Sequence, residues 1–315
     1  MTAQRTVGDV GERALLAEFA RAARRAPGVL VGPGDDAAVI APGATVLSVD
    51  TAVQGHHFRL DWSTPGQIGA RAVVAATADV VAMGARPTGI LVSLASPSTA
   101  PAELITGIND GVVDRAVDLG VAVLGGDLVE AAQIAVSITA VGVLDGVAPV
   151  RLSGAAPGDV LAVSGPLGAS AAGYAALSRG VEDGEAVAAF RCPAPDPAQG
   201  PIAARAGAHA MTDVSDGLVE ELRLLAAASG VDVDVDTAAI PITVSTATVA
   251  EQAGLDARTW ALAGGEDHEL LAAFGAAGDV PGGWSVIGRV LRSGSQPEPV
   301  CVDGRPPRVE GWHSV

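Results

Sequence analysis

The sequence predicts an α/β protein of two domains, and three observations support this: the length of the chain, the alternation of helix and strand patterns along it, and a change of composition near its middle. The chain has 315 residues, whereas single hydrophobic cores usually stop growing near about 250–300 residues. The composition changes at residues 151–159, which are rich in Gly, Ala and Pro and precede a new apolar strand pattern. We therefore expect one domain over residues 1–150 and a second over residues 151–315.

The first half of the chain alternates helical and strand patterns. An Ala-, Leu- and Arg-rich stretch follows the turn residues Gly8 and Asp9 and predicts a helix over residues 12–26. Pro65 opens a long helical pattern that ends at Met83, because Gly84 is typical of a helix terminus. The other elements expected here are strands over residues 44–53, 89–94, 121–124 and 133–144 and a helix over residues 101–119.

The second half mixes the same patterns. A loop at residues 211–217 is expected to open a helix over residues 218–229. The other elements expected here are strands over residues 160–164, 231–235 and 270–274, a helix over residues 168–178 and a Pro-rich loop over residues 192–201.

The composition narrows the classes of function. Hydrophobic residues make up 49% of the chain and aromatic residues 3%, so Ala, Val, Leu and Ile must build the core. The formal net charge of -17 argues against nucleic acid and anionic membranes as partners, because both would be repelled. All 19 basic residues are arginines, which excludes a P-loop lysine, a Schiff base and a kinase-type Lys–Glu pair. An anionic substrate would need metal ions to shield its charge.

The cysteines and the apolar stretches indicate where the protein resides. Cys192 and Cys301 have neither the spacing of a zinc site nor the density of a secreted disulfide scaffold, so we expect reduced thiols. The first 13 residues are too polar for a signal peptide, and the apolar stretch at residues 131–144 is too short to span a bilayer. We expect a soluble, cytoplasmic protein.

Short acidic motifs, set among glycines at expected turns, carry most of the chemistry. Hard cations such as Mg²⁺ prefer oxygen ligands, and phosphate-bound magnesium usually takes one or two carboxylates per ion. Several separated aspartates could therefore hold several ions. The motifs are Gly34-Asp35-Asp36, Ser48-Val49-Asp50-Thr51, Asp79 in the first long helix, Gly125-Gly126-Asp127, and Asp213-Val214-Ser215-Asp216-Gly217.

Each motif alone also has a simpler interpretation. Gly-Asp-Asp and Gly-Gly sequences are common in turns, and Ser215 or Asp216 before a helix is a natural N-cap. Asp79 lies in an apolar Val/Ala helix, where a carboxylate facing the core would be costly without a partner. His56 and His57 follow a strand, and neighbouring strand residues point to opposite faces, so at most one should enter a site.

Two further segments are open to both interpretations. Arg151 stands alone at the expected domain junction, where it is either a surface arginine or a phosphate contact. The acidic segment Gly264-Gly265-Glu266-Asp267-His268-Glu269 is either a solvated turn or part of a site.

Taken in order, the motifs resemble the thiamine-monophosphate kinase family of the aminoimidazole ribonucleotide synthetase superfamily. Single motifs are weak signals, whereas the ordered set spans nearly the whole chain. The matching segments are GDDAAV at 34–39, SVDTAVQGHHF at 48–58, ADVVAMGARP at 78–87, GGD at 125–127, RLSGAAPGD at 151–159, SGPLGASAAG at 164–173, MTDVSDGL at 211–218 and GGEDHEL at 264–270.

The resemblance implies two α/β domains of synthetase type, an N-terminal domain that forms a shared barrel in a homodimer, and ATP bound in a cleft. The residues that it implies for magnesium are Asp36, Ser48, Asp50, Asp79, Asp127, Asp213 and Asp216, with Asp50, Asp127 and Asp216 central to catalysis. Those implied for ATP are Gly126, Asp127, Arg151 and Ser215, and those for thiamine monophosphate are His57, Glu266 and Trp312. The chain departs from the usual family pattern at Val49, Leu128 and His268.

The reaction implied is in-line transfer of the γ-phosphoryl group of ATP to thiamine monophosphate, which gives thiamine diphosphate and requires several Mg²⁺ ions. Two alternatives remain. One is another ATP-dependent enzyme of the superfamily, although the members that rely on a cysteine near either end are not matched by Cys192 or Cys301. The other is a non-enzymatic protein that binds divalent cations, although the sequence has no EF-hand loop.

Overall fold

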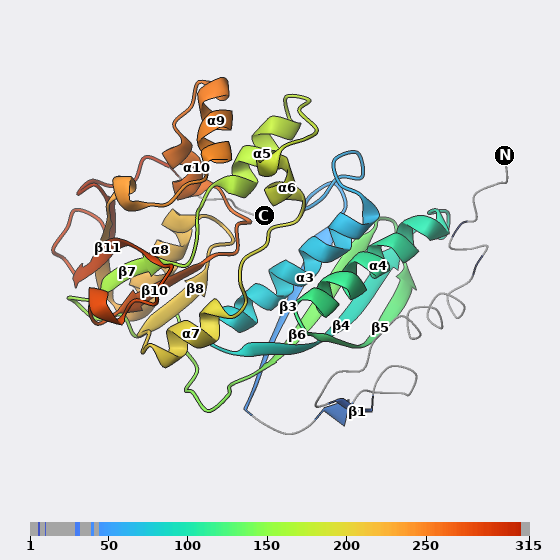
Figure 1. The fold of residues 1–315 in the computed structure, drawn as a ribbon, viewed down its shortest axis with the longest axis horizontal. Helices are drawn as coiled ribbons and strands as arrows, with labels where there is room; N and C mark the ends of the chain where they lie inside the picture. Colours follow the sequence, from blue (N-terminus) through green and yellow to red (C-terminus); the bar gives the residue numbers. More distant parts are fainter. Residues whose placement is uncertain (1–5, 7–9, 11–28, 32–38, 41–43, 310–315) are drawn as a thin grey trace. The chain divides into compact units, whose positions relative to one another are not determined.

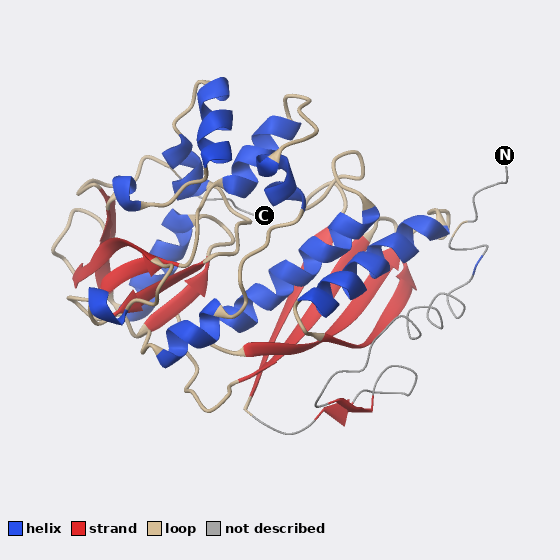
Figure 2. Cartoon of the chain, viewed as in Figure 1, coloured by secondary structure: helices blue, strands red, loops and turns tan. Residues whose placement is uncertain are grey.

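The computed structural model describes residues 6, 10, 29–31, 39–40 and 44–309, and the expected helix at residues 12–26, Asp36 and Trp312 lie outside this part. The chain forms two compact units. The N-terminal unit comprises Met1–Val80 and Pro87–Val143, and the C-terminal unit comprises Val81–Arg86 and Leu144–Val315. Both units combine helices with a sheet (Figure 2), so the α/β class predicted from the sequence is confirmed.

The N-terminal unit is built on a four-stranded sheet with the strand order β3-β6-β4-β5. The strands are β3 (Thr45–Val53), β4 (Arg86–Ser96), β5 (Ala122–Glu130) and β6 (Ala135–Val143). Strands β3 and β6 are antiparallel, and β4 and β5 are parallel. The helices α3 (Pro65–Ala82) and α4 (Ala102–Asp118) lie together over one face (Figure 1). A short pair, β1 (Val29–Val31) and β2 (Val39–Ile40), is antiparallel.

Glycines allow α3 and α4 to pack backbone against backbone. A Cβ at Gly69 would lie 2.0 Å from the carbonyl oxygen of Ile108, and a Cβ at Gly111 would lie 2.0 Å from that of Gly66. No side chain can occupy such a space, so these positions require glycine. The close packing holds α3, which carries Asp79, firmly against α4.

The two faces of this sheet differ. Alternate residues, such as Ile90 and Ile138, are fully buried beneath the helices. The other face leaves large apolar side chains exposed, with Leu47 at 66% and Val49 at 64%. Leu91 and Val129 are also exposed there. Because single exposed apolar residues are ordinary but grouped ones are not, this face has the character of an interaction surface.

The C-terminal unit is built on a six-stranded sheet with the strand order β12-β9-β11-β7-β10-β8. All pairs are antiparallel except β12 with β9. The strands are β7 (Val160–Val163), β8 (Ala210–Asp213), β9 (Val231–Val235), β10 (Leu270–Phe274), β11 (Ser285–Arg292) and β12 (Val300–Val302). The helices are α5 (Ala169–Leu177), α6 (Glu185–Arg191), α7 (Gln199–Arg205), α8 (Leu218–Ser229), α9 (Val244–Ala253) and α10 (Ala257–Ala263), with short 3-10 turns at Thr237–Ala239 and Ala277–Asp279.

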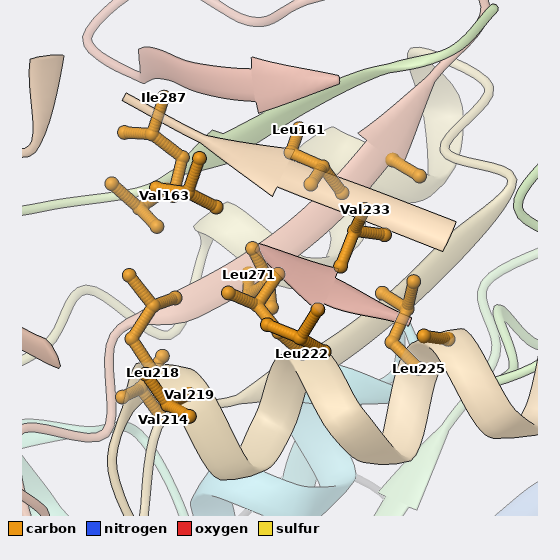
Figure 3. Close-up of a cluster of buried hydrophobic side chains, with 14 of the residues drawn as sticks. Leu161, Val163, Val214, Leu218, Val219, Leu222, Leu225, Val233, Leu271 and Ile287 are labelled. Atoms are coloured by element: carbon orange, nitrogen blue, oxygen red, sulfur yellow. The ribbon is translucent and has the colours of Figure 1, made fainter. Parts of the chain in front are cut away.

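Helix α8 seals one face of this sheet. Leu218, Leu222 and Leu225 point from the helix toward strand residues that include Val163 and Leu271 (Figure 3). On the opposite face a second cluster includes Ala203 of α7 and Phe274 of β10. Strand β10 is covered on both sides, which explains why all five of its residues are apolar and buried.

The structure corrects several element boundaries. Strand β5 does not stop at residue 124 but runs through Gly125-Gly126-Asp127 to Glu130. Strand β8 occupies the start of the loop expected at residues 211–217, and α7 begins inside the expected Pro-rich loop. In the described part of the chain, no helix is long and apolar enough to cross a membrane.

Candidate functional site

In the N-terminal unit, β3 and α3 bring together three of the residues predicted to bind magnesium. The hydroxyl of Ser48 donates a hydrogen bond to Oδ2 of Asp79 at 2.5 Å. Asp50 lies two residues along β3 and therefore on the same face as Ser48. Asp79 is exposed, so the expected difficulty of a carboxylate facing the core does not arise.

The chemistry of this set suits a hard cation. Ser48, Asp50 and Asp79 offer only oxygen donors, which are the ligands that Mg²⁺ prefers. Nevertheless, the described residues contain no group of three or more His, Cys, Asp or Glu side chains arranged to hold a metal ion. The set is compatible with a magnesium site that takes further oxygens from a nucleotide and from water, as phosphate-bound magnesium commonly does.

Asp127 lies on the other face of the sheet. It is paired in register with Ser93, whereas Gly126 is paired with Val92, which is buried beneath the helices. Directly paired strand residues point to the same side, so the carboxylate of Asp127 points away from the face that holds Ser48. The structure therefore does not bring Asp127 together with Ser48 and Asp79.

His57 follows β3 in an exposed turn. Its Nδ1 accepts a hydrogen bond from the backbone N–H of Val53 at 3.1 Å. An Nδ1 that accepts must be unprotonated, so the ring proton of His57 is on Nε2, where it is available as a donor. The neighbouring ring of His56 is inclined by 55° to that of His57, so the two rings do not form a stacked pair.

In the C-terminal unit, two predicted motifs lie side by side and are joined by backbone hydrogen bonds. The N–H of Glu266 donates to the carbonyl of Ser215 at 2.7 Å, and the N–H of His268 donates to the carbonyl of Val214 at 3.0 Å. Glu266 and His268 both have left-handed backbones, with φ of 68° and 56°. A Cβ at Gly265 would lie 2.1 Å from the carbonyl oxygen of Ser215, which explains the glycine in this motif.

His268 links the two motifs through its side chain. Its Nδ1 lies 3.1 Å from Oδ2 of Asp213, and its Nε2 lies 3.7 Å from Oε2 of Glu266. Burial lowers the pKa of His268, but the hydrogen bond with Asp213 and the nearby negative charge of Glu266 outweigh this effect and raise the pKa to about 10. Asp213 and His268 are buried, whereas Glu266 is partly exposed. The sequence interpretation as a solvated turn is therefore wrong for His268.

Glu221 of α8 is a buried acidic residue that the sequence reasoning missed. Its Oε1 accepts hydrogen bonds from the backbone N–H of Asp216 at 3.2 Å and from Oγ of Ser215 at 3.4 Å. Burial, with the nearby charge of Asp213, raises its pKa to about 7. A signal was available: Glu221 lies three residues after Leu218 and one before Leu222, on the core face of the helix.

Asp267 and Glu269 attach a third predicted motif, residues 164–173. Asp267 accepts hydrogen bonds from the N–H groups of Gly168 at 2.6 Å and Ser170 at 2.9 Å, at the start of α5. Glu269 accepts one from the hydroxyl of Ser164 at 2.5 Å. Burial raises the pKa of Asp267 to about 6 and also raises the pKa of Glu269. Both carboxylates organise the unit internally, a role that no specific sequence signal indicates.

The other predicted residues of this unit are placed as follows. Arg151 is exposed, and its carbonyl accepts the N–H of Met211 at 3.0 Å, beside the start of β8. Ser215 and Asp216 are partly exposed. The C-terminal unit thus presents Arg151, Ser215, Asp216 and Glu266 as groups that a ligand can reach.

Comparisons with known proteins agree with the two-part division of the chain. Residues 34–144 match the family described as AIR synthase related protein, N-terminal domain, and residues 156–296 match the corresponding C-terminal domain. A thiamine-monophosphate kinase of Mycobacterium tuberculosis is 46% identical over 314 residues, which cover 98% of this chain and 93% of that protein.

Solved structures of thiamine-monophosphate kinases also resemble this chain over most of its length. A thiamine-monophosphate kinase from Stenotrophomonas maltophilia K279a has a TM-score of 0.77 at 31% identity, covering 89% of this chain and 92% of that one. AaThiL in complex with AMPPCP and TMP has a TM-score of 0.79 at 24% identity and covers 99% of both chains. At that identity the second match shows the fold alone. The expected two-domain fold of synthetase type is confirmed.

Proposed function

This chain belongs to the thiamine-monophosphate kinase family, within the AIR synthase related proteins, and we propose the following assignment of its residues to the reaction. The activity is ATP-dependent phosphorylation of thiamine monophosphate, which produces thiamine diphosphate. The observation that carries this conclusion is the 46% identity over nearly the full length of a thiamine-monophosphate kinase. AaThiL, which shares the fold, binds AMPPCP and TMP together.

The chemical step needs alignment and charge neutralisation more than it needs a base. An oxygen of the thiamine phosphate forms a bond to the γ-phosphorus of ATP while the bond from that phosphorus to the bridging oxygen of ADP breaks. The attacking phosphate is already ionised, so no proton has to be removed first. The protein therefore has to hold two anions in line and offset their repulsion.

Mg²⁺ is the group that would offset this charge. We propose that Ser48, Asp50 and Asp79 hold magnesium in the N-terminal unit, since they form an oxygen-only set on one face of β3 and α3. In the C-terminal unit we propose the partly exposed Asp216, whereas Asp213, which is buried against His268, stays a prediction. When bound, magnesium would neutralise phosphate charge and favour the in-line arrangement. Asp36 and Asp127 stay predicted magnesium ligands. Asp127 would bind an ion separately from Ser48, Asp50 and Asp79.

For ATP we propose contacts from Gly126, Asp127, Arg151 and Ser215. Arg151 is exposed and provides a planar guanidinium that suits a phosphate. Ser215 is partly exposed and its Oγ is directed by Glu221. With no lysine in the chain, arginine and metal ions supply the positive charge that nucleotide phosphates require.

For thiamine monophosphate we propose contacts from His57, Glu266 and Trp312. The Nε2–H of His57 would donate to the phosphate, because its Nδ1 already accepts from Val53. The partly exposed carboxylate of Glu266 would pair with the cationic thiazolium. Trp312 would stack on a ring of the substrate, as aromatic side chains do with cations.

A homodimer is the assembly that we propose. The face of the N-terminal sheet that α3 and α4 leave uncovered carries the exposed side chains of Leu47, Val49, Leu91 and Val129. A second copy presenting the same face would bury them, as expected of a two-fold interface. Val49→Glu should lower the mass measured by sedimentation to that of a monomer, whereas Val244→Glu, at another exposed valine, should not. An unchanged mass for Val49→Glu would contradict this interface.

The location that we propose is the cytoplasm. Cys192 and Cys301 are both free thiols, as expected in a reducing compartment.

One assay tests the activity and its acceptor together. ATP consumption is measured with thiamine monophosphate, with unphosphorylated thiamine and with neither, in the presence of Mg²⁺. We expect consumption only with thiamine monophosphate, since thiamine offers a neutral hydroxyl and no side chain here is assigned as a base. Equal rates with thiamine would contradict the acceptor, and equal rates with neither acceptor would contradict a kinase.

A further inference from the structure

Glu221 is a buried carboxylate in the first turn of α8, directly beneath the motif of residues 211–217. Only 3% of the residue is exposed. Its neighbours on the same helix face, Leu218 and Leu222, belong to the hydrophobic core. A glutamate in such a place is costly unless its oxygens are satisfied, so its contacts should show what it is for.

The contacts of Glu221 all lead to one motif. Oε1 accepts from the backbone N–H of Asp216 at 3.2 Å and from Oγ of Ser215 at 3.4 Å, and Oε2 accepts from Oγ1 of Thr212 at 3.5 Å. These donors lie on both sides of Asp213 in the sequence. One side chain therefore fixes the peptide of Asp216, the hydroxyl of Ser215 and the residue before Asp213.

The charges around Glu221 are unfavourable for a residue with a purely structural role. Asp213 and Asp216 are the nearby charges, and both are negative. Among the described residues, no arginine or histidine forms an ion pair with it, whereas the adjacent Glu220 pairs with Arg223. An apolar side chain would suit the core better. We therefore explain the glutamate by the groups that hydrogen-bond to its oxygens, which are Thr212, Ser215 and Asp216.

A helix-dipole role does not explain this arrangement either. Acidic residues in the first turn of a helix are stabilising, and α8 has two of them, Glu220 and Glu221. In the described part of the chain, the side chain of Glu221 accepts hydrogen bonds from Ser215 and Asp216, whereas that of Glu220 pairs with Arg223. Glu220 is therefore a matched control, because it shares the turn and the charge.

We propose that Glu221 is a positioning residue for phosphoryl transfer, which holds Ser215 and Asp216 in the orientation that ATP and its metal ion require. The proposal rests on the assignment of these two residues to the site. Glu221 does not touch the substrate itself. It supports the motif from below, while the backbone of residues 266–268 binds the same motif along its edge.

Four variants test this proposal: Glu221→Gln, Glu221→Met, Glu221→Asp and the control Glu220→Gln. Gln keeps an acceptor at the same distance, Met removes it while conserving volume, and Asp keeps the charge but shortens the reach. The readouts are kcat, KM for ATP, KM for thiamine monophosphate, the Mg²⁺ concentration for half-maximal rate, and the thermal midpoint.

Misplacing a catalytic group by about 1 Å can cost about 100-fold in rate, so we expect kcat to fall about 10- to 100-fold for Met and Asp. In the same two variants, the Mg²⁺ concentration that gives half the maximal rate should rise, while KM for thiamine monophosphate should change little. Glu221→Gln should restore kcat to within about threefold of the wild type, and Glu220→Gln should match the wild type.

The outcomes that would overturn the proposal are distinct from failure of the proposed function. If Glu221→Met folds and turns over like the wild type, Glu221 has no positioning role. If Glu221→Met does not fold, wild-type turnover in Glu221→Asp would exclude that role instead. If Gln loses as much activity as Met, the acceptor is not what matters. If the wild type itself shows no ATP consumption that depends on thiamine monophosphate, the function fails and not this inference.

Discussion

His268 is the counter-charge of Asp213 inside the C-terminal unit. The two side chains meet at 3.1 Å, and both are almost completely buried. Since the pKa of His268 is raised to about 10, the imidazole is cationic at neutral pH and compensates the carboxylate. Removing either partner leaves a buried charge alone, which is far more costly than losing a pair at the surface.

His268→Phe should therefore destabilise the protein strongly. Leaving a buried charge unpaired costs about 3–5 kcal/mol, and we expect a loss of that order in the free energy of unfolding, measured with urea in the absence of Mg²⁺. The control is Arg86→Met, because Arg86 pairs with Asp145 and both of these side chains are exposed. Exposed pairs are worth about 1 kcal/mol or less, so an equal loss in both variants would contradict the argument.

The same pair predicts a pH dependence of stability. The pKa of His268 in the folded state, about 10, exceeds the ordinary value of 6.5. The stabilisation from the protonated ring is therefore fully present below about pH 6.5 and is lost as the pH rises through about 10. The gap in unfolding free energy between wild type and His268→Phe should narrow by at most about 1.4 kcal/mol per pH unit. A gap that stays constant from pH 6 to about pH 10.5 would contradict the assigned protonation.

Asp267→Ala should weaken the attachment of α5. The substitution leaves the N–H groups of Gly168 and Ser170 without their acceptor. Relief of a buried carboxylate offsets part of this cost, so we expect a net loss of about 1–3 kcal/mol in unfolding free energy. Asp256→Ala is the control, since Asp256 caps α10 from an exposed position, where a cap is worth about 1 kcal/mol. A smaller effect at Asp267 than at Asp256 would show that Asp267 does not hold α5.

Asp50→Asn should nearly abolish turnover without unfolding the protein. A ligand that holds magnesium on transferring phosphates contributes several kcal/mol to the transition state, so we expect kcat to fall at least about 100-fold at saturating Mg²⁺. Asp61→Asn is the control, because Asp61 is exposed and paired with Arg59. Activity close to wild type in Asp50→Asn would remove Asp50 from the metal set.

Gly265→Ala should separate the two motifs of the C-terminal unit. Its Cβ would lie 2.1 Å from the carbonyl oxygen of Ser215, so the backbone must move. A shift of about 1 Å near the site can cost about 100-fold in rate, and we expect kcat to fall at least about 10-fold. Gly278→Ala, where no atom lies within 4 Å of the new Cβ, should behave like the wild type. Normal kcat in Gly265→Ala would mean that contact between the motifs does not set the geometry.

Elements with a strong period could be predicted from the sequence, and irregular ones could not. The helix at residues 218–229 and the strands at residues 231–235 and 270–274 agree with the structure to the residue. Helix α9 was missed because Val and Thr dominate its first turns and favour strands. Strand β11 was missed because Gly288 and a register shift interrupt its alternation.

The candidate site also has a part that the sequence could indicate and a part that it could not. Residue type and motif pattern point to Ser48, Asp79 and Asp213 as predictions, but the face on which a strand residue lies depends on register. The shift between Ile90 and Leu91 sets the side of the sheet to which Asp127 points, and one sequence contains no signal for it. The roles of Glu221 and Asp267 depend on contacts with distant parts of the chain.

The capping of α5 by Asp267 also bears on inhibitor design. A glycine-rich turn at the start of a helix is a familiar place for phosphate groups, and the segment around Gly168 looks like one. Here a carboxylate from the same polypeptide already occupies it. A phosphate mimic that binds at this turn would compete with the carboxylate of Asp267. Because this carboxylate belongs to the same chain, its effective concentration is in the millimolar range or above. Compounds intended to displace the nucleotide should therefore be directed at Arg151 and Ser215, the contacts proposed for ATP, instead.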